Sequence, residues 1–348
     1  MQQHIIISND IERDLATAVA ESEHDRVFVL TDDTTHECCL PKVAALLAQY
    51  DAVPITIAHG DQHKTLAALG DVWTALQQGG ATRHSLLVNL GGGMITDLGG
   101  YAAATFKRGI NFINIPTTLL AMVDASVGGK TGINFGGLKN EVGVFNDSKY
   151  VILDTEFLKT LDDENICSGY AEMLKHGLIS TEAMWEELVN FDLANPDLKQ
   201  LQRMVGDSVK VKERIVELDP HEKGIRKALN LGHTFGHAFE SWALKRKPIL
   251  HGYAVAFGLI PELYLSVAKT GFPTDKMRQT VTFIKENYGT LNITCDDYDE
   301  LIELMHHDKK NQNGIINFTM LGGIGDIRIN QTATTEEIKE ALDFFREG

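Results

Sequence analysis

The sequence predicts two domains of different class, an α/β domain followed by a mostly α-helical one. Short β-rich runs alternate with helical patterns up to residue 157, which is typical of a parallel sheet covered on both faces by helices. From residue 158 onward β-rich runs become scarce and helical patterns dominate. With 348 residues the chain exceeds what one hydrophobic core usually supports. We therefore expect one domain over 1–157 and a second over 158–348.

The elements of the first domain follow from composition and from the residues that end each run. Strands are predicted where Val, Ile, Leu and Phe crowd together, at residues 27–30, 53–57, 85–90 and 111–115. Helical patterns cover residues 43–49, 65–78 and 95–105. Gly79 and Gly80 end the second helix, and Pro116 ends the last strand because it cannot donate to a ladder.

The second domain is predicted from helical periodicity. Helical patterns run over residues 169–178, 182–190, 198–217, 231–242 and 255–268. One late run, at residues 315–321, has the composition of a strand.

The charge of the chain excludes several kinds of partner. Asp and Glu number 48 against 32 Lys and Arg, which gives a formal net charge of −16. Nonspecific binding of nucleic acid or of an anionic membrane requires basic surface, so neither is expected. Residues 1–10 lack the features of a signal peptide, and no apolar run is long enough to span a bilayer. We therefore expect a cytoplasmic protein.

A triple glycine marks the first candidate binding site. Gly91-Gly92-Gly93 lies between a predicted buried strand and a predicted helix, where the backbone can approach a phosphate and the helix N-terminus attracts it. Thr96 stands where the dinucleotide fingerprint has its third glycine, so a simple tight turn is the alternative. The position after a buried strand favours a Rossmann-like nucleotide site.

A lysine in a second glycine-rich stretch is a candidate anion contact. The segment GGKT at 128–131 resembles the end of a P-loop, but Asp124 stands where that motif requires its first glycine, so the P-loop interpretation fails. Lys130 is either a solvated surface charge or a contact to an anion. The nearby Lys139 favours the anion.

Histidines in the helical half indicate a metal. His233 and His237 are four residues apart, so on a helix they share one face, and His251 follows after a short turn. Upstream, Glu172 places a carboxylate on a helix otherwise patterned for burial. Mixed histidine and carboxylate ligands suit a catalytic divalent metal such as zinc. The alternative is a helix with two polar histidines. The HExxH pattern of many metalloproteases is absent.

Basic residues recur beside these elements. They are Arg108, Lys130, Lys139, Lys175, Lys212, Arg226 and Lys309. Each of these residues alone is typical of a solvated helix face. If their side chains meet at one site, however, they would suit the binding of a polyanionic substrate. A nucleotide, a metal and a polyanion together suggest redox chemistry on a phosphorylated acid.

Taken in order, these motifs resemble the 3-dehydroquinate synthase family of the sugar phosphate cyclase superfamily. The matching segments extend from about Leu30 to Asp326 and include GGGMITD at 91–97, PTTLLAMVD at 116–124, VGGKT at 127–131, GLKN at 137–140, NLGH at 230–233, HG at 251–252 and DKK at 308–310. The resemblance implies an NAD-binding Rossmann-like domain and a helical domain binding one divalent metal, zinc or cobalt. It implies a homodimeric lyase of the shikimate pathway that converts a phosphorylated sugar acid, 3-deoxy-D-arabino-heptulosonate 7-phosphate, to 3-dehydroquinate and phosphate.

The resemblance also implies roles for individual residues. The implied metal ligands are Glu172, His233 and His251, and His237, a ligand candidate by spacing, instead matches a substrate-site histidine. The implied catalytic residues are Lys175, Glu222, Asn230 and His237. The implied substrate contacts are Asp124, Lys130, Asn140, Lys212, Arg226, Lys309 or Lys310, and Arg108, which the family supplies across the dimer. The implied NAD contacts are Asp32, Asp61, Lys64, Gly92, Gly93, Met94, Asp97, Thr117, Thr118, Lys130, Lys139, Phe157 and Thr160.

Three other functions are weighed against this resemblance. A different sugar phosphate cyclase is disfavoured by Asn230 and by residues 308–310, which match the dehydroquinate type. A metal-dependent polyol dehydrogenase of the same plan would accumulate NADH and would need fewer anion contacts. An inactive NAD-binding scaffold is disfavoured by the retention of four site residues, Glu172, His233, His251 and Lys130.

Overall fold

The computed structural model describes residues 3–306 and 315–347, which fall into two compact units. Unit 1 comprises Met1–Asp162 with Asp197–Val209, and unit 2 comprises Asp163–Pro196 with Lys210–Gly348. Helix α8 (Leu198–Leu218) therefore begins in unit 1 and ends in unit 2.

Unit 1 is built on a six-stranded parallel sheet with strand order β1-β8-β5-β4-β2-β3. Its strands are β1 (His4–Ile7), β2 (Val27–Asp32), β3 (Val53–Ile57), β4 (Leu86–Gly91), β5 (Asn111–Pro116) and β8 (Tyr150–Leu153). The central strands β2 and β4 are buried along their whole length, as expected when helices cover both faces. Gly91 pairs with Pro116, so β4 and β5 end level with each other.

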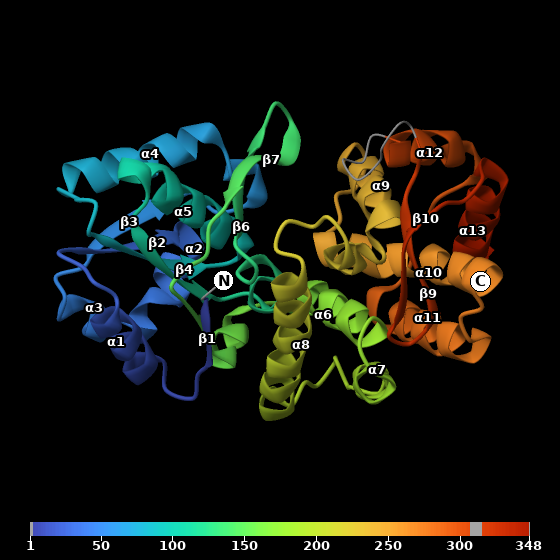
Figure 1. Cartoon of the computed structure of the whole chain (residues 1–348), viewed down its shortest axis with the longest axis horizontal. Helices are drawn as coiled ribbons and strands as arrows, with labels where there is room; N and C mark the ends of the chain where they lie inside the picture. The colour runs from blue at the N-terminus through green and yellow to red at the C-terminus, as the bar shows by residue number, and fades with distance from the viewer. Residues whose placement is uncertain (1–2, 307–314, 348) are drawn as a thin grey trace. The chain divides into compact units, whose positions relative to one another are not determined.

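Helices cover this sheet from both sides. They are α1 (Ile11–Glu21), α2 (Asp33–Cys38), α3 (Ala44–Ala48), α4 (Leu66–Gln78) and α5 (Gly93–Thr105). Figure 1 shows α1 and α4 on opposite sides of the strands. Thr65 caps α4 by accepting a hydrogen bond from the Ala68 amide, and Leu69, Val72 and Leu76 pack into the core.

An antiparallel hairpin, β6 (Lys130–Phe135) and β7 (Leu138–Phe145), completes unit 1. Strand β6 packs against α5, and Ile133 is buried there. Every residue of β7 is exposed, although five large apolar side chains lie in the hairpin. These are Phe135, Leu138, Val142, Val144 and Phe145.

In its described residues, unit 2 is helical with one small hairpin. Its helices are α6 (Asp163–Leu178), α7 (Glu182–Val189), α9 (His233–Leu244), α10 (His251–Thr270), α11 (Thr274–Tyr288), α12 (Tyr298–His306) and α13 (Thr335–Glu347), and its strands are β9 (Phe318–Gly323) and β10 (Asp326–Gln331). Helix α10 is the centre of the packing, because it contacts α6, α9, α11, α13 and β9. It is apolar on most sides, as a helix surrounded by others must be.

Glycines let α9 and α10 approach backbone to backbone. A Cβ at Gly258 would lie 2.0 Å from the Gly232 carbonyl oxygen, and one at Gly236 would lie 2.9 Å from the Ala254 carbonyl oxygen. This contact places the N-terminal halves of both helices side by side, and both carry the histidines singled out above.

The structure confirms the predicted fold class and refines the element boundaries. Helix α9 begins at His233 rather than residue 231, because Gly232 adopts a left-handed conformation (φ 80°) that no helix continues. Helix α10 begins at His251, four residues before the predicted start. The late strand is β9, and its partner β10 was not predicted.

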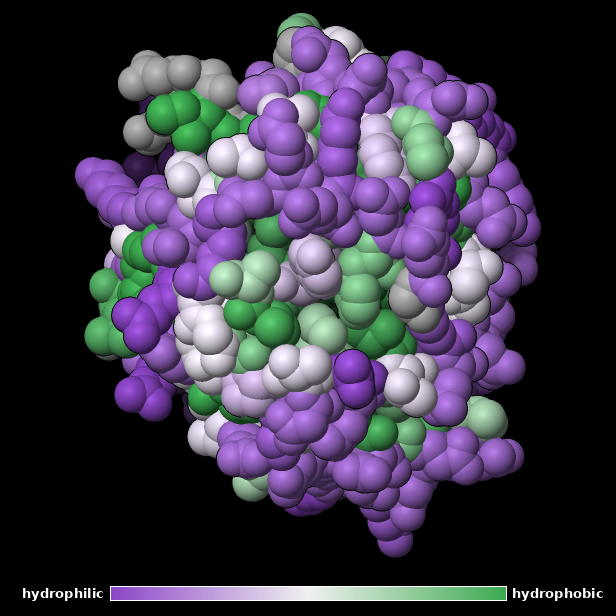
Figure 2. Space-filling view, turned by 90° about the vertical axis from the view of Figure 1, so that its right-hand side faces the viewer, coloured by the Kyte–Doolittle hydropathy of each residue, from purple (hydrophilic) through white to green (hydrophobic). Residues whose placement is uncertain are grey.

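One face of the molecule is mainly hydrophilic. Figure 2 shows a mainly hydrophilic face with apolar side chains gathered near its centre. Within the described residues, no helix combines the length and the hydropathy that crossing a bilayer would need.

Candidate active site

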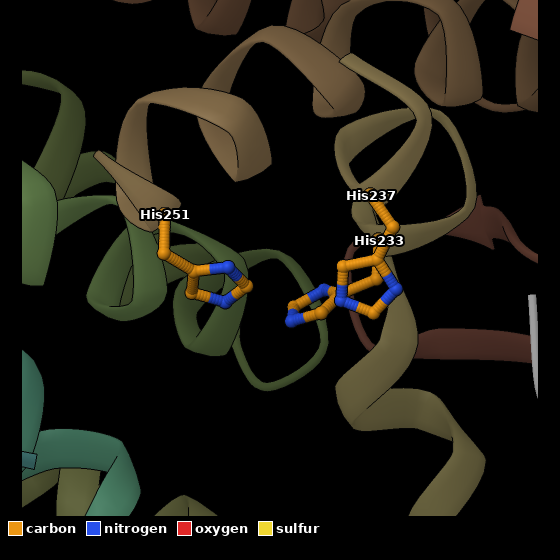
Figure 3. Close-up of side chains that lie close together, drawn as sticks. All are labelled: His233, His237 and His251. Atoms are coloured by element: carbon orange, nitrogen blue, oxygen red, sulfur yellow. The ribbon is translucent and has the colours of Figure 1, made fainter. Parts of the chain in front are cut away.

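Three histidines of unit 2 point toward one another. His233 and His237 lie one turn apart on α9, and His251 is the first residue of α10 (Figure 3). One nitrogen of each ring lies within 4.8 Å of the others. The ring centroids are 5.3, 5.5 and 5.9 Å apart. The i, i+4 spacing therefore places both α9 side chains beside His251.

Glu172 brings a carboxylate to two of these histidines. It lies on α6 and is wholly buried. Its Oε1 atom is 3.4 Å from His233 Nε2 and 3.7 Å from His251 Nε2. Ligand atoms about 2.0–2.1 Å from a tetrahedral ion lie about 3.4 Å apart, so both distances from Glu172 Oε1 are close to the distance between two ligands of one metal. The three histidines form an alternative set that shares His233 and His251.

The buried carboxylate of Glu172 fits a cation. Neither of its oxygens accepts a hydrogen bond from a described residue, although Lys175, one turn later, forms an ion pair with Oε2. Burial alone would raise the pKa of Glu172, but Lys175, then His233 and His251, hold that pKa well below its usual range. The carboxylate is therefore ionised at neutral pH, which is the form that binds metal.

Two further contacts fix the tautomers of the histidines. The Nδ1 atom of His233 lies 3.1 Å from the Leu231 carbonyl oxygen, and Nδ1 of His251 lies 3.1 Å from Glu240 Oε2. With Nδ1 donating, Nε2 carries the lone pair and faces Glu172, as metal-ligating histidines do. Glu240 was not predicted. Its position seven residues after His233 places it on the same face of α9 and could have indicated it.

The turn before α9 brings together three predicted substrate-site residues. The side chain of Asp219 accepts backbone hydrogen bonds from Lys223 (2.9 Å), Gly224 (2.6 Å) and Arg226 (3.1 Å). Arg226 is 1% exposed, and its Nη1 atom donates to the Pro220 carbonyl at 2.6 Å.

A side-chain hydrogen bond between Glu222 and Asn230 links two ends of the same segment. The Asn230 side-chain amide donates to Glu222 Oε1 at 2.7 Å. Glu222 holds a left-handed backbone (φ 57°), an uncommon conformation for a residue with a side chain. The structure thus places a carboxylate, an amide and a buried guanidinium within one short segment. Asp219, which organises the segment, was missed because nothing in its local sequence distinguishes it.

In unit 1 the triple glycine lies where β4 ends and α5 begins. A Cβ at Gly91 would lie 2.6 Å from Ile95, and one at Gly92 would lie 3.0 Å from Thr118. The Thr117 amide donates to the Gly91 carbonyl at 3.0 Å. The loop therefore lies at the carboxyl edge of a parallel sheet beside a helix N-terminus, the usual position of a nucleotide phosphate in α/β sheets.

A buried lysine forms one cluster with four other predicted site residues. Lys64, 4% exposed, donates from Nζ to Asp97 Oδ2 at 3.0 Å and to Asn140 Oδ1 at 2.5 Å, and lies 3.5 Å from Asp61 Oδ1. Lys139 Nζ lies 3.3 Å from Asp61 Oδ2. Burial raises the pKa of Asp97, although Lys64 acts to lower it. The hairpin is thereby tied to α5.

The remaining predicted residues are distributed over both units. Asp32 caps α2 by accepting from the Thr35 amide at 2.7 Å. Phe157 is fully buried, and Thr160 Oγ1 lies 3.9 Å from Cys39 Sγ. In unit 1, Met94 lies on α5, and Arg108 follows α5 with a φ of 68°. Asp124 is half-buried, and Lys130 is the first residue of β6. In unit 2, Lys175 and Lys212 are buried. Lys309 and Lys310 lie outside the described residues.

Comparison with known proteins gives one consistent result. Residues 54–168 match the family model for the 3-dehydroquinate synthase N-terminal domain, and residues 169–311 match the model for the C-terminal domain. The 3-dehydroquinate synthase of Parabacteroides distasonis is 56% identical over 348 residues, covering 100% of this chain and 99% of that protein. The enzyme of the same name from Shewanella piezotolerans is 35% identical over 92% of this chain and 90% of that protein.

A solved structure shares the fold. It is 2-deoxy-scyllo-inosose synthase in complex with carbaglucose-6-phosphate, NAD⁺ and Co²⁺. It superposes with a TM-score of 0.86 at 24% identity, covering 99% of this chain and 96% of that one.

Proposed function

Because the chain belongs to the 3-dehydroquinate synthase family, we propose that it converts 3-deoxy-D-arabino-heptulosonate 7-phosphate to 3-dehydroquinate and phosphate. The observation that carries the proposal is the cluster of Glu172, His233 and His251, which combines the donor set and spacing of a catalytic metal site. The chain is an enzyme, a phosphorus–oxygen lyase, whose reaction consists of oxidation, phosphate elimination, re-reduction, ring opening and aldol closure.

We assign the metal to Glu172, His233 and His251, with zinc or cobalt as the ion. A metal bound there supplies Lewis acidity for the substrate hydroxyl groups. The choice of Glu172 over His237 as the third ligand is supported by the 3.4 and 3.7 Å distances of its oxygen from the two histidines. His237 then remains on the same face of α9 to contact the substrate.

We assign NAD to unit 1. Bound there, NAD would supply a transient acceptor for the substrate hydride, with no net formation of NADH. The amides at the start of α5 would hold its phosphates, together with Thr117 and Thr118. Asp32 at the end of β2, Asp61, Lys64, Asp97 and Lys139 supply the polar contacts, while Phe157 and Thr160 lie in the turn after β8.

The basic and amide side chains hold the two ends of the substrate. We propose that Lys130, Asn140, His237 and Lys309 or Lys310 bind phosphate, and that Lys212, Arg226 and Asn230 bind the carboxylate end. Asp124 and Arg108 complete the substrate contacts, and Lys175 and Glu222 act with Asn230 and His237 in catalysis. Holding both ends keeps the reacting carbon atoms in order, which lowers the entropic part of the barrier.

We also propose a cytoplasmic homodimer. The exposed apolar residues of the β6–β7 hairpin support an interface between two copies, because an unpaired apolar edge strand favours association. Arg108 follows α5, the helix against which β6 packs, and is proposed to serve the partner's site. A cytoplasmic location fits the soluble substrate and cofactor.

The test measures phosphate release from the heptulosonate phosphate with and without NAD⁺ and after chelation, while NADH absorbance is followed. We expect release that requires both NAD⁺ and metal, no net NADH, and 3-dehydroquinate as the product. Net NADH without phosphate release would instead identify a polyol dehydrogenase. A carbocycle formed from a different sugar phosphate, with none from this substrate, would identify another cyclase.

A further inference from the structure

We infer that Glu262 is a positioning residue of the metal site, because its buried carboxylate caps α9 and fixes the backbone on both sides of His233. The inference rests on the proposed function, since His233 is a ligand of the proposed metal. Glu262 lies on α10 and belongs to none of the motifs that identified the site.

Helix α9 begins without a cap of its own. Its N-cap residue, Gly232, has no side chain, and the first turn contains no acidic residue. The first N–H groups of a helix have no partner within it, so they need an acceptor from elsewhere. His233 and Thr234 are buried, so bulk water does not supply that acceptor.

Glu262 supplies the acceptors from the neighbouring helix. Its Oε2 atom accepts the Gly232 amide at 2.6 Å, and its Oε1 atom accepts the Thr234 amide at 2.9 Å and the Phe235 amide at 3.4 Å. The side chain is 0% exposed. A carboxylate that accepts on both oxygens at a helix N-terminus also interacts favourably with the helix dipole.

The cap acts directly on the metal ligand. Gly232 and Thr234 are the residues on either side of His233, so a single carboxylate accepts hydrogen bonds from the amides of both neighbours. The imidazole is then oriented by the Leu231 carbonyl, 3.1 Å from Nδ1, and Nε2 faces Glu172. The position of Nε2 therefore depends on a backbone that Glu262 fixes.

The close packing of α9 and α10 makes this reach possible. Gly258 and Glu262 are one turn apart on the same face of α10, and Gly258 lies directly against the Gly232 carbonyl. A side chain at position 258 would hold the helices apart and withdraw the carboxylate from the amides. The close contact at Gly258 and the buried carboxylate of Glu262 thus act together to hold the start of α9.

The test compares zinc affinity in two variants of the full chain. Glu262→Gln keeps the size but turns one acceptor oxygen into an NH₂ group that cannot accept from the facing amide. We expect its metal-free form to bind Zn²⁺ about 10- to 100-fold more weakly than wild type in competition with a chromophoric chelator. The visible spectrum of the Co²⁺-loaded variant is expected to shift. Glu262→Leu, which removes both acceptors, is expected to bind Zn²⁺ still more weakly. Should the leucine variant fail to fold, the result for the glutamine variant alone tests the inference.

A matched control separates positioning from stability. Thr181 caps α7 in the same unit by accepting from the Met184 amide at 3.3 Å. Thr181→Ala is expected to lower the Tm and leave the Zn²⁺ Kd unchanged. Wild-type Kd and Co²⁺ spectrum in Glu262→Gln, with only a lower Tm, would overturn the inference while leaving the proposed reaction intact. Weakened zinc binding in the variant, with no 3-dehydroquinate from wild type, would uphold the inference and refute the reaction.

Discussion

Arg226 is held in place before any substrate arrives. Its guanidinium is buried and donates to the Pro220 carbonyl, while its own amide is bound by Asp219. Because the side chain is already ordered, little conformational entropy is lost when it meets a carboxylate. The forked donor geometry of arginine suits that partner better than the point charge of lysine.

Replacing this side chain tests its assignment to the substrate. Arg226→Ala is expected to raise the KM for the heptulosonate phosphate by about 10- to 100-fold, because a hydrogen bond to a charged group contributes about 1.5–3 kcal/mol. The Kd for NAD⁺ is expected to stay unchanged. Steady-state kinetics and NAD⁺ titration check both, with Arg226→Lys as the control that keeps the charge. Equal losses in both constants would contradict the assignment.

Asp219 predicts a pH dependence of stability. Hydrogen bonds from the Lys223, Gly224 and Arg226 amides hold its pKa below the ordinary value of 3.8. A carboxyl group with a lowered folded pKa stabilises the fold above its unfolded pKa, and this contribution is lost as the pH falls through the folded pKa.

The corresponding variant separates the charge from the shape of the side chain. Asp219→Asn is expected to lower the free energy of unfolding of the metal-free protein at pH 7. The deficit relative to wild type is expected to narrow as the pH falls from about 5 toward 3. Urea unfolding at several pH values measures it. A deficit that stays constant over this range would show that the charge is not what stabilises the turn.

At the scale of elements, the contact between α9 and α10 decides the geometry of unit 2. Gly232, Gly236 and Gly258 remove the side chains that would separate the two backbones. The helices can then place His233, His237 and His251 around one centre. Glycines also permit close packing at the start of helix α5 in unit 1, where a Cβ at Gly92 would lie 3.0 Å from Thr118 and one at Gly93 would lie 3.2 Å from Ala125.

Paired glycine substitutions test this packing. In Gly258→Ala the new methyl group would lie 2.0 Å from the Gly232 carbonyl oxygen, so we expect destabilisation of about 1–3 kcal/mol. Gly70 lies within α4, and a methyl group added there would have no neighbouring atom within 4 Å, so Gly70→Ala is expected to stabilise by about 0.5–1 kcal/mol. Chemical denaturation of both variants is the measurement. Similar changes in the free energy of unfolding for Gly258→Ala and Gly70→Ala would show that the contact between α9 and α10 contributes less than the loss of backbone entropy.

At the scale of the whole molecule, an acidic chain exposes one apolar hairpin. The net charge of −16 opposes association, yet Phe135, Leu138, Val142, Val144 and Phe145 are each 37–56% exposed. Burying this surface against a second copy would remove it from water and pair the open edge of β7.

Charge on the hairpin is therefore expected to dissociate the proposed dimer. Val144→Lys places a cation where two copies would meet, and it should shift the protein toward monomer and reduce activity, since Arg108 is proposed to serve the partner. Analytical ultracentrifugation measures the shift. Leu66→Lys, at a 51% exposed position on α4, is the control and should leave the oligomeric state unchanged. An unaltered dimer in Val144→Lys would place the interface elsewhere.

The sequence by itself determined the local features of this protein. Composition located β3, and periodicity located α4 and the helical half, because those signals lie within a few residues of one another. The order of the glycine, histidine and lysine motifs led to the family. The spacing of His233 and His237 alone placed both on one face of a helix.

Only the tertiary structure decided which distant groups complete the site. The cap of Glu262 on α9 joins residues 30 positions apart, the bond from Lys64 to Asn140 joins residues 76 apart, and Glu172 meets His233 from a separate helix. Hairpin β6–β7 also escaped prediction, because its pairing depends on the packing of β6 against α5. Such contacts form when the chain folds back on itself and brings distant segments together, and when buried polar groups find partners. Neither requirement leaves a periodic pattern in the sequence.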